Sequence, residues 1–194
     1  MDVTDPDEAS LLDFERLATR RRTNLRMDVD RPVPPDLVER LCRLVMWAPN
    51  HKKTWPWRFA TFTGDGRSRL GNTIADALDP ATFDKPEKIE KYRVKYLRAP
   101  LMLVVGTAPG ESEIRHAENR DAVSAGVQNL LLGATAAGLA SFWASIIPDA
   151  GPAVAELCGW EPGTRTVAVI YLGWPTGETP APERPAPEIH RVVS

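Results

Sequence analysis

The chain has 194 residues, which is long enough for one domain with a sizeable core, and its net charge of −2 gives no electrostatic reason to expect a nucleic-acid partner. No apolar run reaches the about 20 residues of a membrane span, and the acidic stretch from Met1 to Glu8 has no signal-peptide pattern. We therefore expect a cytoplasmic protein without a membrane partner, in which the two distant cysteines, Cys42 and Cys158, are buried thiols.

Helices are predicted on both sides of an aromatic loop in the first half of the chain. Residues 1–9 are acidic and we expect them to be disordered, whereas apolar residues at helical spacing mark a helix around residues 11–18. A second helix is expected over residues 37–48, where Pro49 ends it. The predicted elements that follow are a strand over 58–63, a turn at 64–66, helices over 67–78 and 85–98, and an apolar strand over 101–107 that is buried on both faces.

The longest predicted helix covers residues 117–137 and has small or apolar residues on nearly every side. Such a helix lies at the centre of a fold or at an interface, and Gly138 is its expected C-terminal cap. The predicted elements after it are a strand over 139–145, a short helix over 151–158, a strand over 166–172, and a proline-rich extended tail. Helices come first and are followed by mixed strands and helices, which indicates an α+β fold around one sheet.

The segment from Trp47 to Phe59 has the sequence WAPNHKKTWPWRF and combines three tryptophans with one histidine and three cations. Flat aromatic walls together with hydrogen-bond donors and positive charge suit a planar, anionic, aromatic ligand. The alternative interpretation is a tryptophan-rich corner of the core with solvated lysines. The segment alone favours neither interpretation.

Arg21, Arg22 and Thr23 directly follow the first predicted helix. A guanidinium group presents a fork of donors that matches phosphate oxygens, and a hydroxyl group adds another donor. A phosphate site is therefore one interpretation of these residues. The other is that the cations neutralise the C-terminal end of a helix, which is a common and modest effect.

The sequence contains no motif of a hydrolase, a nucleotide-binding loop or a metal site. The three histidines, His51, His116 and His190, lack the spacing of metal ligands, so we expect no metal. No G-x-S-x-G, P-loop or H-E-x-x-H motif occurs, and no glycine-rich dinucleotide fingerprint follows a predicted strand. The sequence therefore identifies no catalytic side chain.

Four segments occur in the order and spacing typical of one protein family. They are RRRTNLR near the start, WAPNHKKTWPWRF after the second predicted helix, AVSAGVQNLLLGATAAGLASFWAS in the long helix and the following strand, and VAVIYLGWP near the end. The first resembles the R-R-S motif of the nitroreductase family, and the second resembles its A-P-S/D-x-x-x-x-Q-P-W-x-F motif. From Leu17 to Gly173 the chain resembles this family, and most of all its small bacterial members with a D-H-K or N-H-K loop.

The resemblance implies an α+β, nitroreductase-like fold with a central, mainly antiparallel sheet flanked by helices, assembled as an intertwined homodimer. Residues 10–173 would form the FMN-binding domain, and the tail over 174–194 would clasp the partner subunit. The implied FMN contacts are Arg21, Arg22 and Thr23 at the phosphate and ribityl chain, His51 reaching across from the partner subunit, Trp55 in the place of the motif's Gln, and Trp143, Ala144 and Ser145 in the place of a W-R-S segment. Gly133 to Gly138 would lie near the nicotinamide nucleotide.

The implied activity is that of an FMN-dependent oxidoreductase, which transfers hydride from NAD(P)H to a nitroaromatic, a quinone or a related small acceptor. Such chemistry depends on the flavin ring more than on side chains. Two departures from the family pattern matter here, because Trp55 replaces an amide with a large plane and Ala144 replaces a cation. They keep two alternatives open: a flavin-holding or flavin-like-ligand binding protein of the same fold with little turnover, and an interaction protein with a degenerate pocket.

Overall fold

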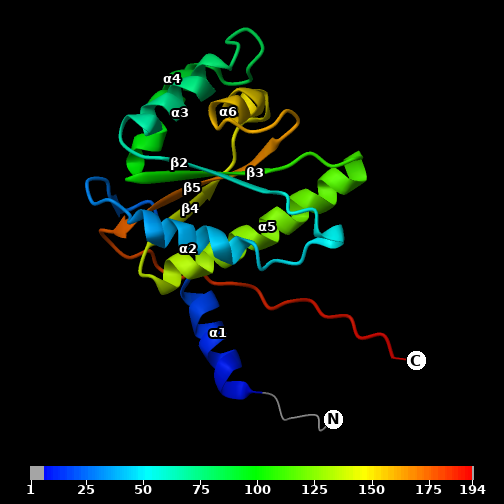
Figure 1. Cartoon of the computed structure of the whole chain (residues 1–194). Coiled ribbons are helices and arrows are strands. Elements are labelled where there is room, and N and C mark those ends of the chain that lie inside the picture. Colours follow the sequence, from blue (N-terminus) through cyan, green and yellow to red (C-terminus); the bar gives the residue numbers. More distant parts are fainter. Residues whose placement is uncertain (1–6, 194) are drawn as a thin grey trace.

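Five strands form one sheet in the computed structural model, which describes residues 7–193 (Figure 1). The strands are β1 (Met27–Asp28), β2 (Trp57–Phe62), β3 (Leu101–Thr107), β4 (Ala140–Ala144) and β5 (Arg165–Pro175). Their order is β1-β5-β3-β2. In addition, β4 pairs with β5 along the edge opposite to β3. Each of these strand pairs is antiparallel, which confirms the predicted sheet.

Helices cover both faces of this sheet, as expected for the predicted α+β class. The α-helices are α1 (Glu8–Arg20), α2 (Pro35–Val45), α3 (Asp65–Asp76), α4 (Ile89–Lys95), α5 (Glu113–Ala136) and α6 (Gly151–Leu157). The short 3-10 turns are η1 (His51–Lys53), η2 (Pro86–Lys88), η3 (Tyr96–Arg98) and η4 (Pro148–Ala150). Figure 1 shows α2 and α5 on one face of the sheet and α3, α4 and α6 on the other.

The side chains of β3 alternate between two cores, because successive residues of a strand point to opposite faces. Leu101, Leu103 and Val105 pack in the core beneath α2 and α5, whereas Met102 and Val104 pack in the core beneath α3, α4 and α6. All seven residues of β3 are buried. The prediction of a strand buried on both faces is therefore confirmed.

The central helix α5 begins at Glu113, four residues before the predicted start. Ser112 caps it, because the Ser112 side chain accepts a hydrogen bond from the backbone N–H of Arg115. The helix ends at Ala136, one residue before the predicted end, and Gly138 lies just beyond its C-cap with a φ of 78°. This left-handed conformation is the usual reason for a glycine after a helix, so the expected cap is confirmed.

Several other predicted boundaries are wrong. Residues 64–66 do not form a separate turn, because α3 already begins at Asp65, and α2 ends at Val45 with only irregular turns before Pro49. The predicted helix over 85–98 is divided into η2, α4 and η3. The sequence pattern does not predict β1, because a strand of two residues has no periodicity. Pairing with β1 extends β5 to Pro175, so Trp174 and Pro175 belong to the sheet rather than to the tail.

Both cysteines are free, as expected, but they are only half-buried and not fully buried. Burial raises the pKa of Cys42 to about 11 and that of Cys158 to about 12. The two thiols are therefore protonated at neutral pH and are poor nucleophiles.

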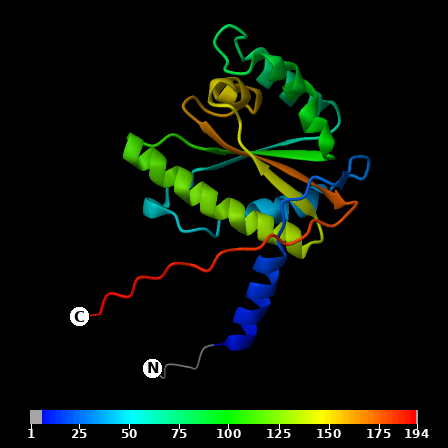
Figure 2. The same ribbon diagram turned by 180° about the vertical axis from the view of Figure 1, so that it is seen from behind.

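Helix α1 and the C-terminal tail extend away from the sheet and the helices packed on it (Figures 1 and 2). None of the residues of α1 is buried, and its apolar side chains Leu11, Leu12 and Phe14 are exposed. The tail after Pro175 contains no helix or strand within the described chain, and its Ile189 and Val192 are also exposed. Two segments with apolar side chains thus lie outside the core of this subunit.

The first of these segments begins earlier than the sequence suggests. Asp7 caps α1 by accepting a hydrogen bond from the Ser10 N–H, so residues 8 and 9 are helical although we expected disorder over 1–9. Residues 1–6 lie outside the described part of the chain. None of the helices between residues 7 and 193 is long and apolar enough to cross a bilayer.

Candidate functional site

Arg21, Arg22 and Thr23 leave the end of α1 in an extended conformation and run beside the start of β4. Arg21 is the residue that caps α1, with φ −57° and ψ 127°. Thr23 forms an isolated parallel bridge with Ser141 of β4, and the next backbone N–H, that of Asn24, donates to the Ser141 carbonyl over 3.0 Å. The fold therefore places residues 21–23 beside the start of β4, whereas residues 143–145 lie at the other end of that strand.

The arginines of this segment have no carboxylate partner within residues 7–193. Burial lowers the pKa of Arg21, and the positive charges of Arg184 and Arg22 lower it further. Nη1 of Arg22 donates to the carbonyls of Thr19 and Arg21, but its buried Nε has no partner. Three guanidinium groups thus gather without a compensating charge, and an anion at this place would relieve their repulsion.

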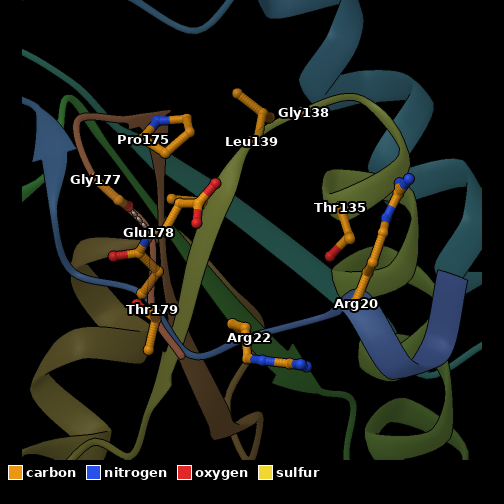
Figure 3. A pocket seen from close by; sticks show the side chains of 11 residues that line it. Arg20, Arg22, Thr135, Gly138, Leu139, Pro175, Gly177, Glu178 and Thr179 are labelled. Carbon is orange, nitrogen blue, oxygen red and sulfur yellow. Dashed lines mark hydrogen bonds between the residues drawn. The ribbon is translucent and has the colours of Figure 1, made fainter. Parts of the chain in front are cut away.

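A cavity of about 540 Å³ adjoins this segment, and Arg22 is one of its lining residues. Figure 3 shows Arg20 and Arg22 on one side of the cavity and the segment Gly177–Thr179 on the other. Thr135 and Gly138 at the end of α5 also line it. The cavity is cationic on one side, while Glu178 brings a carboxylate to the opposite side.

Asn24 fixes the geometry of this region, although the sequence analysis does not single it out. Its side chain is buried, and its Nδ2 donates to the carbonyl of Gly177 over 2.9 Å. Its Oδ1 accepts from the backbone N–H of Arg26 over 2.8 Å. Asn24 thereby joins the segment after α1 to β4 and to the start of the tail, which sets the two walls of the cavity.

Trp143, Ala144 and Ser145 lie at the end of β4, but their side chains do not share one environment. Trp143 packs against the core beneath α2 and α5, whereas Ala144 packs against the opposite core. Ser145 follows the strand and is exposed. The alternation of a β-strand therefore separates side chains that the sequence motif groups together.

His51 and Trp55 lie in the loop between α2 and β2, far from Arg22 in the same subunit. Thr54 of this loop contacts Asn119 of α5, whereas Thr135 of α5 lines the cavity beside Arg22. The two α5 positions are sixteen residues apart, which corresponds to about 24 Å at the α-helical rise of about 1.5 Å per residue. One subunit therefore does not unite all the predicted FMN contacts.

The three tryptophans of this loop region have different surroundings. Trp57 is 7% exposed and belongs to the core beneath α2 and α5, while Trp47 is 84% exposed and Trp55 is 55% exposed. The core interpretation of the WAPNHKKTWPWRF segment is therefore correct for Trp57. The ligand interpretation stays a prediction, and it would rest on the exposed rings of Trp47 and Trp55.

Gly133 has a packing role between α2 and α5, and its predicted place near the nicotinamide nucleotide stays a prediction. A Cβ at this position would lie 2.4 Å from Cδ1 of Leu44, so the glycine allows α2 and α5 to approach each other. Within the predicted nucleotide segment, Thr135 and Gly138 line the cavity, whereas Gly133 does not. A small residue within a helix is a packing signal as often as a binding signal, and here the packing partner explains it.

Arg184 is the second residue that sequence reasoning missed. It lies in the proline-rich tail, for which we expected only an extended conformation and a contact with the partner subunit. A cation embedded between Pro182 and Pro185 in an otherwise extended segment is the signal that could have marked it. Its positive charge lowers the pKa of Arg21, so the two guanidinium groups repel each other.

Metal ligands are not grouped anywhere within residues 7–193, where no cluster of three or more His, Cys, Asp or Glu side chains could hold a metal ion. His51 and His190 are exposed, and His116 is buried in α5. The cavity itself is lined by the guanidinium groups of Arg20 and Arg22, by hydroxyl groups such as that of Thr135, and by the Glu178 carboxylate.

The chain belongs to the nitroreductase family, because the model of that family matches residues 18–174. A Bacillus subtilis protein named "Putative NAD(P)H nitroreductase YfhC" is 30% identical over 160 residues, which are 80% of this chain and 81% of that protein. The crystal structure of a nitroreductase-like family protein from Bacillus cereus superposes with a TM-score of 0.73 at 26% identity and covers 90% of both chains.

A further solved structure shares the fold. It is a nitroreductase with bound FMN from Bacteroides fragilis, with a TM-score of 0.72 at 19% identity, covering 92% of this chain and 97% of that one. The family resemblance and the nitroreductase-like fold that we expected are confirmed by these comparisons.

Proposed function

We propose that this protein is an FMN-dependent oxidoreductase that transfers hydride from NAD(P)H to a nitroaromatic, a quinone or a related small acceptor, and that it acts as a homodimer. The observation that carries the proposal is the group formed by Arg21, Arg22 and Arg184, which has no carboxylate partner among residues 7–193. Relatives add support, since the Bacillus subtilis protein is named for NAD(P)H and the Bacteroides fragilis structure contains FMN.

The donor set suits the phosphate of FMN. Guanidinium groups bind phosphate through paired, charge-assisted hydrogen bonds, and the unpartnered Nε of Arg22 supplies a donor that the protein itself does not use. Arg21 and Arg184 would hold the remaining phosphate oxygens, while Thr23 would meet the ribityl chain. The residues present therefore fit the cofactor that the family membership implies.

The aromatic part of the cofactor would lie between residues of two subunits. Trp143, Ala144 and Ser145 would contact it from the subunit that binds the phosphate, and His51 and Trp55 would approach from the other. The separation of about 24 Å on α5 between Asn119, which contacts the loop, and Thr135, which lines the cavity beside Arg22, supports this division. It makes the homodimer a condition of the complete site.

When bound, the isoalloxazine ring supplies the hydride chemistry. The protein's own residues position it and exclude water. Arg21 and Arg22 neutralise the phosphate, β4 supplies a rigid edge, and the exposed ring of Trp55 offers a flat, apolar surface that can exclude water from one side of the site.

The test is an absorption spectrum of the purified protein before and after NADH or NADPH is added without oxygen. We expect a flavin spectrum with one FMN per subunit, released by heating, and bleaching by at least one of the two nucleotides. Apoprotein that shows no binding in a fluorescence titration with micromolar FMN would contradict the proposal.

A second candidate function is favoured by one specific observation. Trp55 occupies the place of the family's Gln and is 55% exposed, and Ala144 offers no cation where the family has Arg. These side chains suit a protein that holds a flavin or a flavin-like ligand with little turnover. A bound flavin that neither NADH nor NADPH reduces would support this alternative over the first.

A further inference from the structure

The loop between α2 and β2 holds three non-glycine residues in the left-handed region of backbone conformation. Lys52, Lys53 and Trp55 have φ values of 61°, 52° and 50°. Residues with a Cβ atom are strained in this region, so such a loop keeps its shape only where the surrounding contacts fix it. The contacts of this loop therefore show which residues control its shape.

One continuous chain of hydrogen bonds connects the loop to α5. The backbone N–H of Trp55 donates to Oδ1 of Asn50 over 3.0 Å, and Nδ2 of Asn50 donates to Oγ1 of Thr54 over 3.1 Å. The Thr54 hydroxyl then donates to Oδ1 of Asn119 over 2.5 Å. Asn50 and Thr54 each accept one of these hydrogen bonds and donate the next. The last acceptor is the side chain of Asn119, which is 2% exposed.

The carbonyl of Trp55 is held from the opposite direction. Nη1 of Arg58 donates to the carbonyl of Trp55 over 3.3 Å and to that of Trp57 over 2.9 Å, while the same guanidinium pairs with Glu161. The backbone of Trp55 is thus fixed on both sides, whereas its ring is 55% exposed. A fixed backbone with an exposed ring is suited to presenting a flat surface at a constant position.

We propose that Asn119 is a positioning residue, which acts through Thr54 and Asn50 to hold the 50–55 loop in the strained shape that presents Trp55 and His51 to a ligand. The hydrogen bonds of the loop support the part of this inference that concerns its shape. The part that identifies the ligand as a flavin and its acceptor rests on the proposed function. Asn119 lies on the buried side of the central helix, so its hydrogen bond ties the loop to α5.

The first arm of the test measures the loop without any cofactor. Thr54→Val keeps the shape of the side chain but removes both hydrogen bonds, whereas Thr54→Ser keeps them. We expect trypsin to cleave Thr54→Val after Lys52 or Lys53 about tenfold faster than wild type, because cleavage follows the population of the opened loop. Thr54→Ser should be cleaved at nearly the wild-type rate, and mass spectrometry identifies the cleavage site.

The second arm measures the consequence for the reaction, with menadione as the acceptor and NADH or NADPH as the reductant. For Thr54→Val we expect KM for menadione to rise about fivefold, with kcat within about twofold of wild type and with FMN per subunit unchanged. Asn119→Asp, which keeps the acceptor oxygen, should behave like Thr54→Ser, and Asn119→Leu like Thr54→Val. Equal melting temperatures show that a variant has kept its fold, and the Thr54 pair decides the test if Asn119→Leu does not fold.

The two arms separate the inference from the proposed function. Equal trypsin cleavage of Thr54→Val and Thr54→Ser would overturn the positioning role, whatever the activity. Faster cleavage of Thr54→Val in a protein that binds no FMN would support the holding of the loop and overturn its role towards a flavin. Faster cleavage with unchanged KM would show that the loop shape does not serve the acceptor, which also contradicts the proposal.

Discussion

Single side chains in this protein have different effects at the two ends of α5. At its C-terminal end, Arg21, Arg22 and Arg184 concentrate positive charge without a partner among residues 7–193. At its N-terminal part, Asn119 instead accepts from a neutral chain of hydrogen bonds that runs through Thr54 and Asn50 to the backbone N–H of Trp55. The positive charge near the C-terminal end of α5 would select an anionic ligand, and the loop held near its N-terminal part would position that ligand.

Removal of the two adjacent arginines tests the phosphate assignment. Changing both Arg21 and Arg22 to Ala should weaken FMN binding by about 3 kcal/mol, or about a hundredfold in Kd, since each charged hydrogen bond contributes about 1.5 kcal/mol or more. Riboflavin lacks the phosphate and should lose much less. Fluorescence titration of both flavins gives the comparison, and equal losses would mean that the arginines support the fold instead.

Arg184 provides a test with a matched control in the same tail. Arg184→Ala should weaken FMN binding about tenfold and leave riboflavin binding unchanged, because one cation near the phosphate is lost. Arg191→Ala removes the same charge from an exposed position further along the tail. If the two variants lost FMN affinity equally, the effect would reflect net charge and not a specific contact.

The Arg58–Glu161 ion pair predicts a pH dependence. Hydrogen bonds from Arg58 lower the pKa of Glu161 to about 2 from a reference of 4.5. Because the folded-state pKa is depressed, the pair stabilises the fold above pH 4.5, and this stability is lost as the pH falls towards 2. The pair is partly exposed, so Glu161→Gln should cost about 0.5–1 kcal/mol at neutral pH.

Urea denaturation of both proteins at a series of pH values checks this prediction. The difference between wild type and Glu161→Gln should be constant from pH 7 to pH 5 and should shrink below pH 4.5. A difference that stays constant down to pH 3 would show that the glutamate contributes through packing and not through its charge.

At the scale of elements, the packing of α2 against α5 depends on two glycines with different neighbours. At Gly126 an added Cβ would lie 2.5 Å from the carbonyl oxygen of Val45, which is backbone, whereas at Gly133 it would meet the flexible end of Leu44. Gly126→Ala should therefore destabilise the fold by about 1–3 kcal/mol. Gly133→Ala should cost less, because a side chain can rotate away and alanine favours a helix.

The measurement is the free energy of unfolding of both variants in urea at one protein concentration. A Gly126→Ala protein as stable as wild type would show that α2 shifts without cost. Retained FMN binding in a destabilised Gly126→Ala would further show that the α2–α5 contact supports the fold rather than the phosphate site.

Elements with a clear hydrophobic pattern could be predicted from the sequence, and the errors have local causes. The apolar run of β3 and the small residues of α5 identified the two central elements correctly. The start of α5 was hidden because its first turn is polar, and Asp65 and Gly66 suggested a turn although they begin α3. Periodicity contains no information about such ends, which depend on caps such as that of Ser112.

The candidate site could be predicted only in part, because most of its contacts join distant residues. The motif order pointed to residues 21–23 and 143–145. The bridge between Thr23 and Ser141 brings the first group to β4, but to the start of the strand and not to its end. Asn119 lies 65 residues from Thr54 in the chain, and Arg184 lies far from Arg21, so no local pattern links either pair. Such pairs become visible only when the fold places them side by side.

At the scale of the whole molecule, one subunit leaves three features incomplete. Helix α1 exposes Leu11, Leu12 and Phe14 without burying a residue, and the tail exposes Ile189 and Val192. The His51–Trp55 loop and the arginines lie far apart along α5. A second copy of the chain would cover the apolar segments and complete the site, and an obligate interface of this kind buries about 2,000 Å² or more.

Shortening the tail tests this assembly, and the structure shows where to cut. Thr176 donates to the Arg26 carbonyl and Asn24 donates to that of Gly177, so the start of the tail belongs to its own subunit and should be kept. A chain ending at Thr179 retains these contacts and removes Arg184 together with the apolar end. We expect it to lose dimer stability and FMN together, whereas Arg184→Ala should lose FMN affinity alone, because only the truncation removes apolar cover.

Analytical ultracentrifugation with flavin absorbance followed in parallel distinguishes the outcomes. A full-length protein that sediments as a yellow, folded monomer would refute the dimer and with it the composite site. If the truncated protein remains a dimer and keeps its FMN, the dimer model would stand, but the tail would have no part in the interface. The remaining result, a truncated protein that is dimeric but binds FMN only as weakly as Arg184→Ala, would assign the tail a role in the phosphate site and leave α1 as the apolar segment that holds the subunits together.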